Sequence, residues 1–470
     1  MHPLIVRQVI FPLHERIKGK ATYAWLKKLE STQWLAPQRL QEMQLEALKS
    51  HLEYAYRQVP YYRELFDRCA VQPARIKSLE DFSRIPFLTK EIIRTRFADL
   101  KARAQARRIQ EISTGGSTGN PVTVLVDSAR TAFTDAARMR AQRWLGADFG
   151  EREIVLWGSP IEVTKQDRVR QIRDWLINSR LLSAFDLSEN ALARYADYLH
   201  RFRPQKLYGY ASALTLLAAY LKKTGRPAGP GWPRAVFTTA EPLFDFQREL
   251  IEEAFQCPVA VEYGARDAGL IAHECQHGKL HLNAEGILVE IVGDEGGHRD
   301  GRGEIVVTNL QSYAMPLIRY RTGDVGTLET SACTCGRGLP VLGKVEGRQT
   351  DFLVATDGRL LHALAIIYVL REIPSVREFQ VFQESLNRLV VRLVPEPEFS
   401  EADRAAIIRK AKLLLGEQVE VALQKMTQID RLPSGKFRYV ISQVADAYLA
   451  RMVPGSAAES PGRAAEGSPS

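Results

Sequence analysis

The sequence predicts an α/β protein with a large, layered N-terminal domain and a small α+β domain near its C-terminal end. Between Ile112 and Tyr320, short apolar runs of strand length alternate with helical stretches, which is typical of a sheet covered by helices. After Tyr320 the alternation stops, and a smaller unit begins near Asp351. The chain of 470 residues is also too long for one compact core.

The individual elements follow from the spacing of the apolar residues. The first 85 residues are predicted to be helical, because LQEMQLEALKSHLEYAYRQV has apolar residues at helical spacing and Pro60 ends it. Strands are predicted at EIVLWGS, AVFTTAE and VAVEYGA, with helices at SALTLLAAYLKK and PLFDFQRELIEEAF. In the smaller unit we expect a strand pair (EFQVFQ and RLVVRLV), a helix opening at Ser400 with Asp403 in a capping position, and a strand at VEVALQKM.

Composition and charge narrow the class of protein. With 45% hydrophobic and 25% charged residues the chain has an ordinary soluble composition, and its apolar runs are too short to cross a bilayer. The first twenty residues lack a signal-peptide layout, so we expect a cytoplasmic protein. The net charge is +9, which suits anionic substrates such as nucleotides. Because the basic residues are scattered along the chain, no nucleic-acid partner is expected. The basic, partly amphipathic N-terminus allows weak peripheral contact with a membrane.

The segment STGGSTGNP has two interpretations. A glycine-rich turn can point successive backbone N–H groups at an anion, and the Ser and Thr hydroxyls add further donors. The segment lacks the Gly-Lys-Ser/Thr of a Walker loop, however, so by itself it fits a hairpin turn better than a phosphate loop.

Four other segments place charged side chains where a nucleotide could be held. VEYGARDAG puts Asp267 at the end of a strand, and YRTGDVG puts Asp324 in a tight turn, where its two oxygens could accept both hydroxyls of a ribose. KVEGRQTDFL carries Arg348 at the border of the large and small units, and RLPSGKFRYV carries Lys436 in a Gly-containing turn. Each segment alone is an ordinary surface feature; their common order is more informative.

In that order, the chain resembles the adenylate-forming superfamily of acyl-CoA synthetases, luciferases and peptide-synthetase adenylation domains. The segments that carry the resemblance are STGGSTGNP, FTTAEPL, YGARDAG, YRTGDVG, GRQTD and LPSGKFR. HLEYAYRQVPYYRELF and CTCGRGLP are more specific and are similar to the phenylacetate–CoA ligase-like branch, which includes relatives found with capsular polysaccharide genes. The resemblance spans residues 40–445.

The resemblance implies roles for the matching residues. The loop would hold the ATP phosphates, Asp267 would bind Mg²⁺, Asp324 would hold the ribose with Arg348 nearby, and Lys436 would bridge the substrate carboxylate and the α-phosphate. The remaining implied positions contact the nucleotide or the acid. They are Ser113, Thr114, Gly115, Gly116, Ser117, Thr118 and Gly119 of the loop, Glu241, Tyr263 and Gly264 at the nucleotide, and Tyr208, Gly209 and Ser212 at the acid.

The resemblance implies that the chain uses ATP to convert a carboxylic acid to an acyl-adenylate and then transfers the acyl group to the thiol of coenzyme A. By analogy with the branch, the acid is expected to be an aryl acid. Alternatives are transfer to a carrier protein or a polysaccharide-pathway acceptor, and a non-catalytic nucleotide-binding homologue. The implied divisions are a helical region (1–85), a core (86–347), a hinge (348–352) and a small mobile domain (353–450), followed by a Gly/Ser/Pro/Ala-rich disordered tail (455–470).

Three positions depart from the family pattern. Asn120 replaces a lysine often found in the loop, Arg266-Asp267 replaces Thr-Glu, and Ala240 stands where glycine is usual. Aspartate reaches the metal through one methylene fewer than glutamate. These departures suit either a tuned enzyme or a degenerate one.

The cysteines predict a metal site. Five cysteines, an odd number, argue against a disulfide framework. HECQHGKLH and CTCG are two short turns, and pairs of such turns often hold a structural Zn²⁺. By analogy with some members of the branch, we expect Cys275, Cys333, Cys335 and His281 as ligands, with His277 as the substitute for His281. The alternative is a group of reduced cysteines beside surface histidines.

Overall fold

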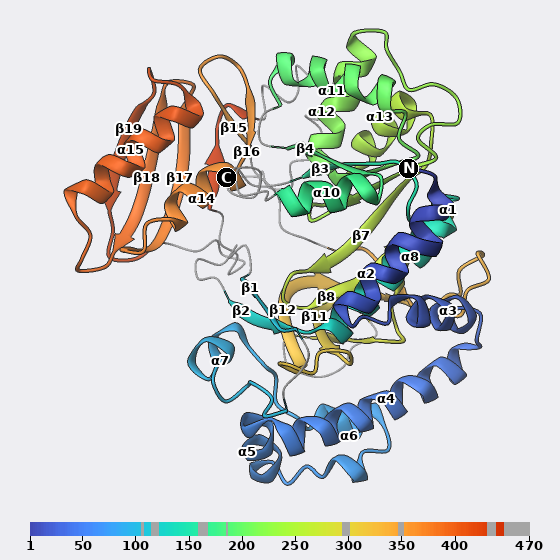
Figure 1. Cartoon of the computed structure of the whole chain (residues 1–470). Helices are drawn as coiled ribbons and strands as arrows, with labels where there is room; N and C mark the ends of the chain where they lie inside the picture. The colour runs from blue at the N-terminus through green and yellow to red at the C-terminus, as the bar shows by residue number, and fades with distance from the viewer. Residues whose placement is uncertain are drawn as a thin grey trace, which may run out of the picture.

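The predicted α/β class is confirmed. The computed structural model describes residues 1–104, 108–113, 122–157, 168–184, 187–293, 301–345, 352–429 and 439–445. Figure 1 shows N-terminal helices beside a core of sheets and helices, with a separate C-terminal sheet and its helices to one side. Within the described residues, no helix is both long and apolar enough to span a membrane.

The N-terminal part of the chain is helical, as the apolar spacing predicts. Its helices are α1 (Pro3–Ile5), the π-helix η1 (Val6–Ile10), α2 (Phe11–Lys18), α3 (Thr22–Thr32), α4 (Pro37–Gln58), α5 (Pro60–Arg68), the 3-10 helix η2 (Pro73–Arg75), α6 (Leu79–Ser83) and α7 (Lys90–Thr95). Pro60 ends α4 and begins α5, a position that tolerates its missing N–H. The buried hydroxyl of Tyr62 ties α5 to the core by donating to the carbonyl of Pro316 at 2.9 Å.

The main sheet has nine strands in the order β13-β14-β9-β8-β7-β6-β5-β3-β4. The strands are β3 (Glu153–Trp157), β4 (Ser179–Ser183), β5 (Lys206–Tyr210), β6 (Ala235–Thr239), β7 (Val259–Ala265), β8 (Gly269–Glu274), β9 (Leu280–Leu282), β13 (Leu328–Glu329) and β14 (Val341–Leu342). Pairing is parallel from β4 to β7 and antiparallel from β7 to β13. The parallel strands therefore end at one common edge, where ligands of such sheets gather.

Helices bury the apolar surface of this sheet. They are α8 (Ser128–Trp144), α10 (Arg168–Leu176), α11 (Glu189–Phe202), α12 (Ala211–Lys223) and α13 (Asp245–Phe255). Helix α12 is buried along most of its length, and Leu214 and Leu217 pack in one core with Leu207 of β5 and Val236 of β6. Apolar area removed from water in this way is the main stabilising contribution to the fold.

Two smaller sheets complete the large unit. One consists of β1 (Gln110–Ser113) and β2 (Thr123–Val126), the other of β10 (Ile287–Val292), β11 (Gly303–Asn309) and β12 (Leu317–Gly326). The prediction of a tight turn at YRTGDVG is wrong, because this segment lies within β12. The pairing with β11 shifts register there, and Gly323 has φ +82°, so a bulge produces the local bend that the sequence suggested.

The C-terminal part contains its own hydrophobic core. Its elements are β15 (Phe352–Val354), β16 (Leu360–His362), α14 (Leu364–Arg371), β17 (Val376–Ser385), β18 (Arg388–Pro395), α15 (Glu401–Leu415), β19 (Glu420–Lys425) and β20 (Val440–Ser442). The cap predicted for α15 is present, since Asp403 N–H donates to the Ser400 hydroxyl and Ser400 N–H donates back to the Asp403 carboxylate. Residues 348–351 of the proposed hinge and the tail lie outside the described residues.

A buried ion pair joins α3 and α8 to the segment that precedes β10. The Arg140 guanidinium donates to Glu285 at 2.5 Å and to the Asn283 side-chain carbonyl at 3.0 Å. The hydroxyl of Thr32 also donates to Glu285, at 2.8 Å. Both charged side chains are at most 1% exposed, so each depends on the other for compensation.

We expect Arg140→Met to destabilise the large unit by about 3–5 kcal/mol, because it leaves the Glu285 carboxylate buried without its charge partner. The double variant Arg140→Met/Glu285→Leu should recover most of this loss, because it removes both charges. Urea unfolding followed by tryptophan fluorescence measures both effects. A double variant as unstable as the single one would contradict this account, and Arg39→Met, in an exposed pair with Glu42, is the matched control.

Candidate active site and cysteine cluster

Predicted site residues meet at the carboxyl ends of the parallel strands. Tyr208 and Gly209 lie on β5, Glu241 follows β6, and Tyr263 lies near the end of β7. The carboxylate of Glu241 accepts a hydrogen bond of 2.9 Å from the backbone N–H of Ser212, at the start of α12. Two residues that the sequence assigned separately, to the nucleotide and to the acid, are therefore in direct contact.

A second contact joins β7 to the bulged strand β12. The hydroxyl of Tyr263 donates to the carboxylate of Asp324 at 3.0 Å. The family resemblance assigns these residues to the adenine pocket and to the ribose, respectively. The structure thus brings together two side chains that belong to different sheets.

The two candidate glycines have a packing requirement of their own. A Cβ at Gly209 would lie 2.5 Å from the backbone oxygen of Leu156, and one at Gly264 would lie 2.7 Å from that of Gly269. Both distances are shorter than any ordinary contact. The close approach of neighbouring strands therefore requires glycine at both positions, whether or not a ligand binds there.

Asp267 is 5% exposed, and both of its carboxylate oxygens have protein donors. One accepts the backbone N–H of Ala268 at 2.9 Å, and the other accepts the hydroxyl of Tyr320. A carboxylate oxygen has two lone pairs, so each oxygen keeps one acceptor position. These open positions are the ones through which Asp267 would bind Mg²⁺.

Arg130 supports the loop around Asp267, and sequence reasoning missed it. One of its nitrogens, Nη2, donates to the carbonyls of Arg266 and Asp267 at 2.8 and 2.7 Å. Burial lowers the pKa of Arg130 to about 10, although the negative charges of Asp267 and Asp127 oppose this shift. Arg130 lies in α8, far from the motif in the chain, and no local pattern distinguishes it from the other arginines of that helix.

A buried polar cluster lies beside Tyr208. Arg138 donates twice to Glu262, at 2.8 Å each, and the Tyr208 hydroxyl donates to the same carboxylate at 2.6 Å. Burial opposes ionisation of Glu262, but the charge and hydrogen bonds of Arg138 prevail and lower the pKa of Glu262 to about 2. Burial lowers the pKa of neighbouring His273 to about 4. The candidate acid side therefore contains a fixed ion pair.

An aromatic surface continues from this cluster. The ring of Trp157 stacks on that of Tyr210, with centroids 4.2 Å apart and 18° between the planes. Its centroid is 6.1 Å from that of Tyr208. These three rings belong to the adjacent parallel strands β3 and β5.

The predicted cysteine cluster forms. Ligand atoms of Cys275, His281, Cys333 and Cys335 all lie within 4.8 Å of one another. The sulfurs of Cys275 and Cys333 are 3.8 Å apart, and Cys335 Sγ is 3.2 Å from His281 Nε2. Two thiolates bound tetrahedrally to zinc at about 2.3 Å would have a separation of about 3.8 Å. The four residues fit a closed zinc site.

The surroundings of the cluster orient its ligands. His281 is fully buried, and its Nδ1 lies 3.1 Å from the carbonyl oxygen of Leu339, which leaves Nε2 directed at Cys335. Backbone N–H groups of His277 and Cys335 point at the sulfurs of Cys275 and Cys333, at 3.4 and 3.5 Å. The side chain of the alternative ligand, His277, is exposed and outside the cluster.

The chain is also similar to known proteins over most of its length. The chain is 24% identical over 462 residues to protein CapK of Staphylococcus aureus, covering 94% of this chain and 98% of CapK. It is 27% identical to a phenylacetate-coenzyme A ligase of Thermus thermophilus, covering 87% and 97% of the two chains. The resemblance to the adenylate-forming superfamily is confirmed.

Two further comparisons extend this result. The family model of the CapK C-terminal domain matches residues 353–443. A crystal structure of 2-hydroxyisobutyryl-CoA ligase in complex with 2-HIB-AMP and CoA superposes with a TM-score of 0.59 at 21% identity, covering 90% of this chain and 93% of the ligase. This likeness shows that the chain has the fold of that adenylate-forming ligase.

Several residues that the family pattern singles out lie outside the described residues. They are Thr114–Gly119 of the glycine-rich loop, Asn120, Arg348 and Lys436. Ser113 is described at the end of β1, where its hydroxyl lies 3.0 Å from that of Thr123 on the antiparallel partner β2. Both the hairpin and the phosphate-loop interpretation are compatible with these flanking strands.

The ion pair at Glu262 should make stability depend on pH. Its folded pKa of about 2 lies below the ordinary value of about 4.3. Acidification therefore protonates the unfolded state first, and the contribution of Glu262 is complete above pH 4.3 or so and is lost as the pH falls towards 2. The contribution of this pair to the urea midpoint should be constant from pH 7 to about pH 4.3 and should decline from there to pH 3, the lowest pH of the series.

The variant Arg138→Met should lose about 2–3 kcal/mol at pH 7, because it leaves Glu262 ionised and unpaired; the loss is smaller than for a fully buried pair because the Arg138 side chain is 34% exposed. The difference from the wild type should shrink as the pH falls, since protonation then removes the uncompensated charge. A difference that is constant from pH 7 to pH 3 would contradict this role. The exposed pair of Lys222 and Glu253 provides the control variant Lys222→Met.

Proposed function

We propose that the chain activates a carboxylic acid with ATP, forms an acyl-adenylate with release of pyrophosphate, and passes the acyl group to the thiol of coenzyme A. The contact between Tyr263 and Asp324, at the ends of strands from two sheets, carries this proposal. The names of the similar proteins support it, because they include phenylacetate-coenzyme A ligases that align over most of their length. A ligase of the same fold binds an acyl-AMP together with CoA.

The proposed roles of the residues follow from the charges that the reaction develops. A carboxylate and ATP repel each other, so fixed donors and cations must stabilise the charge of the departing pyrophosphate. We assign this task to the backbone and hydroxyls of residues 113–119 and to the ammonium of Lys436. We assign Asp324 to the ribose hydroxyls and Arg348 to the same site. The substrate carboxylate is itself the nucleophile, so Ser113 and Ser117 act only as hydrogen-bond donors.

A divalent cation completes this assignment. Asp267, through the acceptor positions that Ala268 and Tyr320 leave open, is the proposed protein ligand of Mg²⁺. Bound Mg²⁺ neutralises phosphate oxygens with few protein ligands. Arg130 positions the Asp267 backbone for this purpose.

We further propose an aryl acid as substrate. The stacked rings of Trp157 and Tyr210, next to Tyr208, offer a flat apolar surface at the ends of the parallel strands. Such a surface favours a planar ring in offset or edge contact. Ser212 and Gly209 belong to the same side of the site.

A second candidate keeps the adenylation and changes the acceptor to a carrier protein or a component of polysaccharide assembly. The observation that favours it is the similarity to CapK, which covers nearly the whole of both chains. A non-catalytic nucleotide-binding homologue is the remaining alternative. The departures at Asn120 and Asp267 leave room for it, whereas the retained Lys436, Asp324 and glycine-rich loop count against it.

We also propose that Cys275, His281, Cys333 and Cys335 hold one structural zinc ion. Four ligands leave no position for a substrate, and bound zinc would fasten the turn after β8 and His281 of β9 to the segment that leads into β14. The chain's own contribution is the orientation of His281 by the carbonyl of Leu339.

Exchange of labelled pyrophosphate into ATP, measured with a panel of aryl and aliphatic acids, tests the proposed adenylation. We expect exchange with at least one aryl acid. The variant Lys436→Ala should lower it by about 10²–10³-fold, because it removes a cation that acts in the transition state. Lys222→Ala, an exposed lysine far from the motifs, is the control and should leave it unchanged.

The same assay separates the alternatives. ATP binding without exchange for any acid would favour the non-catalytic homologue. Where exchange occurs, incubation with coenzyme A or with a phosphopantetheinylated carrier protein identifies the acceptor. Acylation of the carrier protein but not of coenzyme A would support the second candidate.

Metal analysis of the purified chain tests the zinc site. We expect about one zinc ion per chain and a lowered melting temperature after chelation, because a structural zinc contributes directly to folding. Cys335→Ser should lose the metal, whereas Cys257→Ser, which lies outside the cluster, should keep it. Less than about half an equivalent in the wild type would contradict a resident structural zinc.

A further inference from the structure

The N-terminal helices expose an apolar surface that the proposed reaction does not use. A surface helix ordinarily directs its polar side chains outwards, but here large aliphatic residues recur along the outer side. We call this set the N-terminal stripe; its members, each 48–61% exposed, are Leu4, Ile5, Val9, Leu13 and Ile17. Four of them are spaced by four residues, so they follow one side of the helix.

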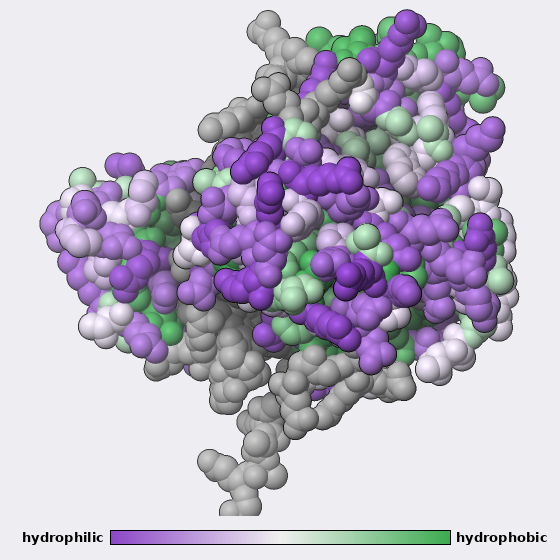
Figure 2. Space-filling view, turned by 90° about the horizontal axis from the view of Figure 1, so that it is seen from below, coloured by the Kyte–Doolittle hydropathy of each residue, from purple (hydrophilic) through white to green (hydrophobic). Residues whose placement is uncertain are grey.

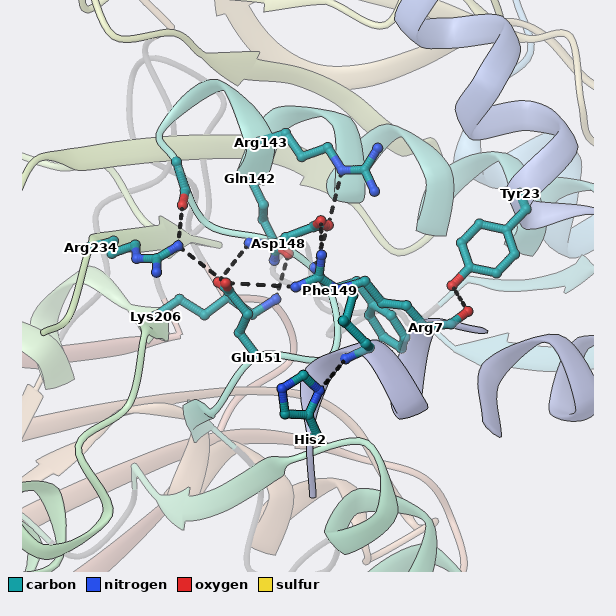
Figure 3. A network of polar contacts seen from close by, with 12 residues as sticks. His2, Arg7, Tyr23, Gln142, Arg143, Asp148, Phe149, Glu151, Lys206 and Arg234 are labelled. Carbon is teal, nitrogen blue, oxygen red and sulfur yellow. Dashed lines mark hydrogen bonds and ion pairs between the residues drawn. The ribbon is translucent and has the colours of Figure 1, made fainter. Parts of the chain in front are cut away.

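The opposite side of the same helices is fixed to the core. Phe11 is buried against Tyr23 and Phe149, with ring centroids 5.3 and 4.4 Å apart. Arg7 forms a salt bridge of 2.8 Å with Asp148, which Figure 3 shows within a larger network of polar contacts. The stripe therefore faces outwards because the inner side is already occupied, and turning it inwards would break this network.

Helix α10 extends the exposed apolar surface. Ile172 and Trp175 of this helix are 58% and 57% exposed. The amino terminus of Met1 donates to the side chain of Asn178, two residues after α10, at 2.9 Å. Figure 1 shows α10 beside the N-terminal end of the chain, and in Figure 2 hydrophobic residues gather at the upper rim of a mostly hydrophilic face.

Positive charge lies beside this surface. Burial lowers the pKa of His14, and the positive charges of Lys20, Lys18 and Arg173 lower it further. Cations from α2, from the loop that follows it and from α10 therefore lie near His14. Arg16 and Lys18 are exposed. The only acidic residue among the first twenty, Glu15, is buried and accepts the backbone N–H of Thr22 at 3.0 Å. Lys20 pairs with Asp135 and Arg173 pairs with Asp174, so the positive charge available next to the stripe is that of Arg16 and Lys18.

We propose that the N-terminal stripe, together with Ile172 and Trp175, docks the chain on a membrane surface that contains anionic lipids. Aliphatic side chains and a tryptophan would enter the boundary between headgroups and acyl chains, while Arg16 and Lys18 pair with lipid phosphates. The helices lie in the interface rather than span it.

Charge complementarity favours a membrane over a second copy of the chain. In a two-fold symmetric dimer the same patch would meet itself, which would place its cations against one another. An anionic bilayer instead supplies the opposite charge.

Co-sedimentation of the full chain with vesicles tests this proposal. Binding is expected to vesicles of phosphatidylcholine and phosphatidylglycerol, to weaken with salt, and to be much lower for phosphatidylcholine alone. The triple variant Val9→Ser/Leu13→Ser/Ile17→Ser should lower the partition coefficient by about tenfold or more. Arg16→Gln/Lys18→Gln should also lower it by about tenfold or more, but only at low salt.

The control is Leu413→Ser, which removes a side chain that is 76% exposed on α15 and should not change binding. Melting temperatures confirm that each variant is folded. The proposal is overturned if the wild type does not bind anionic vesicles, or if the triple variant binds as well as the wild type. A wild-type dimer that the triple variant converts to a monomer in light scattering would assign the stripe to a second copy instead.

Discussion

The change of strand direction at β7 organises both candidate sites. This strand pairs in parallel with β6 and in antiparallel fashion with β8. The parallel side brings Tyr208, Glu241 and Tyr263 to a common edge, because parallel strands end together. The antiparallel side returns the chain as β8 and β9, and the turn between them carries Cys275. The proposed nucleotide site and the cysteine cluster are therefore separated by the length of β8.

Three buried carboxylates among the described residues are each compensated by an arginine. Arg140 with Glu285, Arg138 with Glu262, and Arg319 with Glu290 all place a guanidinium against a buried carboxylate. The planar guanidinium can donate to two oxygens at once, which offsets part of the cost of removing both charges from water. The first two pairs join α8 to the segment before β10 and to β7, and the third joins β12 to β10 within one sheet.

The proposed membrane surface and the proposed active site make different demands on the same large unit. Catalysis requires side chains from several strands to hold fixed positions, which the buried pairs and the close-packed glycines provide. Docking requires only that one helix keep its outer side free. The firm attachment of Phe11 and Arg7 to the core meets that requirement without involving the strands that carry Tyr208 or Asp324.

Local patterns in the sequence determined the α/β class, the main helices and strands, the cap at Ser400, and, through the order of motifs, the family. These properties depend on residues that are neighbours in the chain, so periodicity and turn chemistry reveal them. Only the tertiary structure decided that Asp324 lies in a bulged strand, that His281 rather than His277 joins the cysteines, and that Arg130 and Arg138 support Asp267 and Glu262. Each of these depends on contacts across sheets or between a helix and a distant loop, where no short-range spacing constrains the partners. The side on which the N-terminal stripe faces was likewise set by packing, because both sides of that helix are apolar and only the contacts of Phe11 and Arg7 distinguish them.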